Sequence, residues 1–130
     1  MNAPEHARTL PEPEIKRPPS VTAVGILFVG AGLIGFFYHL LEITGPIQPD
    51  EVLVLGLRIL AVVGGFFVLR GANWARWLLI LWMAIHVMIS IAHSVSELVV
   101  HAVLFGVTAY VLLRSQATLY FREESHSKIP

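Results

Sequence analysis

Four apolar blocks, each close to the length that an α-helix needs to cross a lipid bilayer, constrain this chain more than any other feature. They cover about residues 21–43, 51–70, 74–93 and 96–114. A bilayer with a hydrocarbon core about 30 Å thick is spanned by roughly 20 apolar residues in helical conformation. A helix also satisfies its own backbone polar groups, which lipid cannot do. The sequence therefore predicts an all-α, transmembrane four-helix bundle.

Composition agrees with a membrane class and excludes several kinds of site. Hydrophobic residues make up 55% of the chain and charged residues 14%, against about 45–50% and about 25% in soluble domains. Nine Lys/Arg balance nine Asp/Glu, so charge gives no reason to expect a nucleic-acid partner. The absence of cysteine excludes disulfides, iron–sulfur clusters, thiolate zinc sites and cysteine nucleophiles.

The two ends of the chain differ from its middle. Residues 1–19 are rich in proline and charge, and residues 115–130 are polar apart from Leu119, Tyr120 and Phe121. Segments of this kind bury too little apolar surface to offset their ordering entropy. We expect a disordered tail over residues 1–19, a membrane domain over 20–114 and a second tail over 115–130, with its apolar residues at the level of the lipid headgroups.

Residues that commonly cap helices stand near the expected helix ends. The predicted N-caps are Ser20, Asp50, Asn73 and Ser94, and the predicted C′ residue is Gly71. Ser94 also begins an S-x-x-E sequence, which is the pattern of a capping box. These signals place short connections between the second and third helices and between the third and fourth.

The basic residues predict the orientation of the bundle. With four spans, the two tails and the second connection share one side, and they hold eight of the nine Lys/Arg. The first and third connections hold none. The positive-inside rule then places both termini in the cytoplasm. The ninth basic residue is Arg58, inside the second span.

Polar side chains are concentrated in the outer half of the predicted spans. At 1.5 Å per residue they lie at similar depth, and residues seven apart share a helix face. Glycines lie on the same faces, which is typical of closely packed membrane helices. We predict one shared outer polar pocket formed by His39, Glu42, Arg58, His86, Ser90, His93, Glu97 and His101.

Simpler roles exist for most of these residues. Glu97 suits the capping box, Glu42 and His93 are near the outer surface, and His39 and His101 suit hydrogen bonds between helices. Arg58 is the hardest to explain in this way, because its guanidinium cannot lose its proton. We expect it to pair with Glu42 or Glu97, or else to extend to the outer headgroups.

The start of the third span has the composition of an interfacial anchor. Tryptophan and arginine are enriched where helices cross the headgroup region. The predicted anchor residues are Arg70, Trp74, Arg76 and Trp77.

The segment Leu69–Leu78, followed by Trp82 and the run Ala84-Ile85-His86-Val87, resembles a class of small bacterial four-span membrane proteins of unassigned activity. The likeness extends over most of residues 20–122. The resemblance implies a four-helix bundle in the bacterial inner (cytoplasmic) membrane. It implies no activity and no site residues.

These observations favour a multi-pass membrane protein without catalytic residues, acting as a structural or accessory subunit. The expected partners are the lipid bilayer and either another membrane protein or further copies of the chain. One alternative is a protein that binds haem b or a transition metal, with ligands from His39, His86 and His101. Another is a small transporter or channel. No nucleophile–base pair stands out that would indicate an enzyme.

Overall fold

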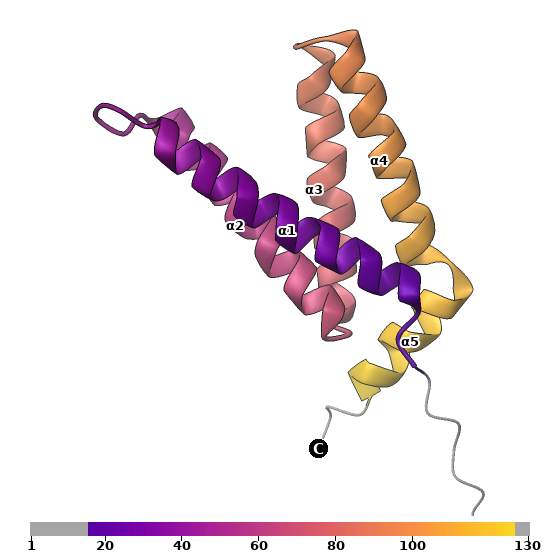
Figure 1. Ribbon diagram of the computed structural model, residues 1–130. Coiled ribbons are helices and arrows are strands. Elements are labelled where there is room, and N and C mark those ends of the chain that lie inside the picture. The colour runs from indigo at the N-terminus through magenta and orange to yellow at the C-terminus, as the bar shows by residue number, and fades with distance from the viewer. Residues whose placement is uncertain (1–15, 127–130) are drawn as a thin grey trace, which may run out of the picture.

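The computed structural model describes residues 16–126, which form five helices (Figure 1). Their bounds are α1 Pro19–Glu42, α2 Pro49–Leu69, α3 Asn73–Ile91, α4 Val95–Leu113 and α5 Ser115–His126. The described part of the chain contains no strand. The tail predicted over residues 1–19 lies mostly outside the described residues, as do residues 127–130.

The four expected spans are confirmed as helices. Helices α1 to α4 are each long and apolar enough to cross a membrane. Their ends differ from the predicted ends by only one or two residues. Residues 16–126 therefore form an all-helical structure with four candidate membrane spans.

Two of the expected N-caps are wrong because a proline begins the helix earlier. Helix α1 begins at Pro19 and α2 at Pro49. Proline is favoured in the first turn, where its missing N–H would have no intrahelical partner. Ser20 and Asp50 therefore lie inside the first turns. Asn73 is likewise the first residue of α3 and not its N-cap.

The C′ prediction at Gly71 and the N-cap prediction at Ser94 are confirmed. The S-x-x-E capping box is only half formed, because the Ser94 N–H donates to the Ser90 carbonyl at 3.3 Å and not to the Glu97 side chain. Gly71 has φ +72° and follows α2 in a Schellman motif, in which its N–H donates to the Val68 carbonyl at 3.1 Å. At the start of α4, the Ser94 hydroxyl accepts a hydrogen bond from the Glu97 N–H at 3.2 Å. Both connections are tight, so α2–α3 and α3–α4 lie antiparallel.

Helices α1 and α2 pack closely because glycines face each other. A Cβ added to Gly65 would lie 2.8 Å from the Gly25 carbonyl oxygen. One added to Gly32 would lie 2.7 Å from a Val62 methyl group and 3.0 Å from the Arg58 carbonyl oxygen. Small residues of this kind allow helix backbones to approach in a membrane. We call α1 and α2 the first hairpin, and α3 and α4 the second hairpin.

The two hairpins meet at one end and diverge at the other (Figure 1). The meeting end contains the start of α1, the α2–α3 turn and α5, and we call it the basic end. There the Arg114 side chain donates to the Ser20 hydroxyl at 2.8 Å, and the Tyr120 hydroxyl donates to the Leu69 carbonyl at 3.4 Å. The hairpin tips, residues 43–48 and 92–94, lie far apart (Figure 1). The single closed bundle that the sequence suggests is thus an open arrangement of two pairs.

The segment expected as a polar tail forms the fifth helix. Ala117 and Phe121 are fully buried and Tyr120 is 5% exposed, while Leu119 stays 51% exposed. The apolar residues at positions 117, 120 and 121 share one helix face. Tyr120 and Phe121 therefore pack against the spans at the basic end and are not free at the headgroup level.

Candidate functional site: the cavity between the two hairpins

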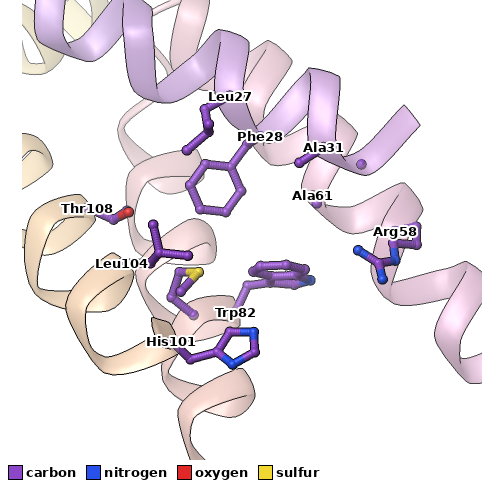
Figure 2. Close-up of a pocket in the computed structure, with 11 residues that line it drawn as sticks. Leu27, Phe28, Ala31, Arg58, Ala61, Trp82, His101, Leu104 and Thr108 are labelled. Carbon is purple, nitrogen blue, oxygen red and sulfur yellow. The ribbon is translucent and has the colours of Figure 1, made fainter. Parts of the chain in front are cut away.

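A cavity of about 120 Å³ lies where all four spans approach one another (Figure 2). Its walls are mostly apolar, and its polar side chains come from three helices: Arg58 of α2, Trp82 of α3, and His101 and Thr108 of α4. This volume is below the lower limit of about 300 Å³ for pockets that take a whole organic ligand. The cavity suits a small group, such as one polar side chain or a few water molecules.

Arg58 lies at the edge of this cavity (Figure 2). Its side chain is half-buried and lies against Gly35, where an added Cβ would be 2.8 Å from the guanidinium carbon. It forms neither a hydrogen bond nor an ion pair with any residue of the described range 16–126. The position of Gly35 in α1 therefore makes room for a cation that the described chain leaves without a carboxylate.

The expected ion pair of Arg58 with Glu42 or Glu97 is not formed. Glu42 is exposed near the tip of the first hairpin, 3.9 Å from His39 Nδ1. Glu97 is exposed at the tip of the second hairpin. Both carboxylates are too close to the diverging tips to reach a cation more than two helical turns along the span.

Trp82 of α3 lies between Arg58 and His101 in the wall of the cavity (Figure 2). Its indole N–H donates to the Leu57 carbonyl at 2.9 Å, and its ring packs edge-on against Phe28 at 5.6 Å. It also stacks on the His86 ring at 3.7 Å. We did not predict Trp82 as a site residue. The available signal was its position two turns inside a span, away from the interface where membrane tryptophans concentrate.

His86, Ser90 and His101 form a polar contact between α3 and α4. The Ser90 hydroxyl, which is 2% exposed, donates to the His86 carbonyl at 2.8 Å and lies 2.7 Å from His101 Nδ1. The two imidazole rings are 5.8 Å apart. These three predicted residues are brought together, and they hold the second hairpin in register.

The carbonyl partners fix the tautomers of both histidines. His86 Nδ1 contacts the Trp82 carbonyl at 3.0 Å, and His101 Nδ1 contacts the Glu97 carbonyl at 2.9 Å. A carbonyl only accepts hydrogen bonds, and the Ser90 hydroxyl beside His101 Nδ1 already donates to the His86 carbonyl. This arrangement assigns the proton to Nδ1 in both neutral rings. The Nε2 lone pairs of both rings are then available to accept a hydrogen bond or bind a metal ion.

The remaining predicted pocket residues lie at the separate hairpin tips. His39 and Glu42 are near the end of α1, His93 lies in the α3–α4 connection, and Glu97 lies in the first turn of α4. His93 is exposed, with Nδ1 bound to the Ile89 carbonyl at 3.0 Å. Because the tips diverge, the eight residues form a central group of Arg58, His86, Ser90 and His101 and two peripheral pairs.

The geometry gives limited support to a bound metal or haem. Within residues 16–126, no three His, Cys, Asp or Glu side chains are grouped to hold a metal ion. His39 is on the other hairpin, so His86 and His101 offer two nitrogen ligands. The cavity is also too small for a haem macrocycle.

The predicted interfacial anchor divides into two parts. Trp74 and Trp77 are about half exposed, at 51% and 52%. Arg76 is only 8% exposed, because it is packed beneath α5, where it donates to the Thr118 hydroxyl at 3.4 Å and faces the Phe121 ring. The tryptophans suit a headgroup region, whereas Arg76 joins α3 to α5.

No family model, curated protein or solved structure matches this chain. The function is therefore inferred from the geometry of the cavity and of the two hairpins.

Proposed function

We propose that this chain is a non-catalytic accessory subunit of the bacterial inner membrane, and that the space between its hairpins receives a transmembrane helix of another protein. The partner helix would carry a carboxylate that pairs with Arg58. The observation that carries this proposal is the Arg58 guanidinium, half-buried inside a span and without a carboxylate among the described residues.

Electrostatics selects the chemistry of the partner. An arginine at the centre of a span costs about 2.5–3.5 kcal/mol on insertion scales. Arg58 cannot lower this cost by losing its proton. A carboxylate from a neighbouring helix would form a charge-assisted, bidentate pair. The nearby Nε2 lone pairs of His86 and His101 would accept hydrogen bonds from the same partner.

The two hairpins diverge, and the partner helix is proposed to lie between them. The divergence between them is widest at the tips (Figure 1). The cavity beside Arg58 is lined by residues of all four spans and would receive a side chain of the partner helix (Figure 2). A docked helix would therefore bury the facing apolar surfaces of both hairpins and bring its carboxylate close to the guanidinium.

The proposed orientation places the basic end in the cytoplasm. This end holds the described basic residues other than Arg58, which are Lys16, Arg17, Arg70, Arg76, Arg114 and Arg122. A reporter active only in the periplasm should work when fused after Gly45 or Val95. It should stay silent when fused after Gly71 or Lys128, and activity at Lys128 would contradict a cytoplasmic C-terminus.

Photocrosslinking from the cavity tests the partner. A crosslinking amino acid at Leu104, which lines the cavity, should capture a membrane protein that has an Asp or Glu within a span. The same label at the neighbouring Val103, which is 60% exposed and outside the cavity, should not. Arg58→Leu should abolish the Leu104 crosslink, and Arg58→Lys should retain part of it.

The identity of the captured molecule decides the outcome. The accessory role is supported if the crosslink is lost when the Asp or Glu within the span of the identified partner is replaced. Capture of a second copy of this chain would make the space a homo-oligomer interface. Crosslinking to lipid alone would contradict the accessory role.

A transition-metal site is a second candidate, favoured only by the two available Nε2 lone pairs. Metal analysis and a visible absorption spectrum of the purified protein separate the two proposals. Metal or haem in the wild type that is lost on His86→Ala, but retained on His93→Ala, would favour the cofactor function.

A further inference from the structure

The basic end carries a second cavity, separate from the space between the hairpins. It has a volume of about 420 Å³ and lies between the segment before α1 and the beginning of α5. It is lined by Lys16, Arg17, Pro18, Pro19, Gln116 and Leu119. This volume falls within the range of about 300–1,000 Å³ that is typical of ligand sites.

The lining combines positive charge with apolar surface and contains no carboxylate. Lys16 forms neither a hydrogen bond nor an ion pair with another described residue. Arg17 donates through Nη1 to the Leu69 carbonyl, and its side chain also contacts the Tyr120 hydroxyl. A guanidinium has five N–H donors, so further N–H groups remain for a ligand. Leu119, 51% exposed, supplies an apolar wall.

With the candidate spans crossing a bilayer, as proposed above, this cavity would lie at the boundary between lipid and water. Lys16 and Arg17 precede α1 directly, and the apolar part of that span begins at Val21. The half-exposed Trp74 and Trp77 also belong to the basic end. Tryptophans of this kind mark the headgroup level.

We propose that this cavity binds the phosphate group of an anionic phospholipid from the leaflet that faces the basic end. Lys16 and Arg17 would contact the phosphate oxygens, the Gln116 amide would donate to the headgroup, and the acyl chains would extend along the apolar surface beyond Leu119. Basic pockets at the headgroup level are typical sites for anionic lipids. This proposal does not depend on the partner of Arg58.

Native mass spectrometry of the full chain in detergent, with phosphatidylglycerol or phosphatidylcholine added, tests the site. The wild type should retain phosphatidylglycerol in preference to phosphatidylcholine. Lys16→Gln should weaken this binding about fivefold, the effect of one basic residue near a membrane surface. Gln116→Glu should weaken it at least as much, because the new carboxylate repels the phosphate.

Arg122→Gln is the matched control, because this substitution removes the same charge as Lys16→Gln. Arg122 is exposed on α5 and lies outside the cavity. If Arg122→Gln and Lys16→Gln weaken phosphatidylglycerol binding equally, the lipid is attracted by the overall positive charge of the basic end and the proposed site is wrong. Equal retention of phosphatidylglycerol and phosphatidylcholine by the wild type would also overturn the proposal. Inorganic phosphate alone should not raise the unfolding temperature. If it does and the lipid adds nothing, the site binds free phosphate and the lipid assignment is wrong.

Discussion

Ser90 connects two of the candidate membrane-spanning helices, α3 and α4, through a single hydroxyl group. It is almost fully buried, and it lies between the His86 carbonyl of its own helix and the His101 ring of α4. From the sequence, helix periodicity placed Ser90 and His86 on one face. The neighbour across the helix pair depends on how α3 and α4 cross, which periodicity does not specify.

Ser90→Ala should destabilise the protein by about 1 kcal/mol, the usual net value of a hydrogen bond between membrane helices. Unfolding in sodium dodecyl sulfate, followed by circular dichroism, measures this change. Ser96→Ala is the control, because Ser96 is an exposed residue in the first turn of α4. Equal stability of the two variants would show that the Ser90–His101 contact contributes nothing.

Tyr120 gives the basic end a defined response to alkaline pH. Burial raises the pKa of Tyr120 above its ordinary value of 10.0, and the charge of Glu124 raises it further, while Arg17 opposes the shift. The unfolded chain therefore loses this proton first. The contribution to stability is complete below pH 10.0 and is lost as the pH rises through the pKa of the folded state.

We expect the free energy of unfolding to fall as the pH rises above 10.0 in the wild type, and to fall less steeply in Tyr120→Phe. Denaturation in detergent over a series of alkaline buffers measures both slopes. Parallel slopes for the two proteins would mean that Tyr120 does not contribute to the decline.

At the scale of elements, length and hydropathy were sufficient to predict α1 to α4. Each block is long enough to span a bilayer. Prolines and glycines stand close to the observed ends of α1 and α2, and Ser94 marks the start of α4. Helix α5 was missed because its burial depends on three side chains at positions 117, 120 and 121 within a polar segment. Such a short pattern predicts a helix only when the surface it packs against is known.

The glycines of α2 should differ sharply in their tolerance of a methyl group. Gly65→Ala places a Cβ 2.8 Å from the Gly25 carbonyl oxygen, so α1 and α2 must separate. We expect a loss of about 1–3 kcal/mol, which is typical of overpacking. Gly56→Ala meets no atom within 4 Å and should cause no loss. Detergent unfolding of both variants is the measurement, and equal tolerance would contradict the close α1–α2 contact.

At the scale of the whole molecule, the sequence predicted that the polar residues lie at similar depth along the helices. It did not predict that they divide into a central group and two separate pairs at the hairpin tips. Its glycines join α1 to α2, and the Ser90–His101 contact joins α3 to α4. Between the two hairpins stand large rings, such as Trp82 against Phe28. Each pair is therefore closed separately, and the polar groups at the tips do not meet. Similar depth predicts a common pocket only if all four helices stay packed side by side along their full length.

The separation of the hairpin tips in a bilayer is the most direct test of this open arrangement. The chain has no cysteine, so spin labels at Gly45→Cys and Val95→Cys report a single distance by double electron–electron resonance. We expect more than about 20 Å, two helix diameters. A control pair at Lys16→Cys and Leu119→Cys, which line one cavity, should give a shorter distance. A tip distance near 10 Å, the spacing of packed helices, would show a closed bundle and contradict the space proposed for the partner of Arg58.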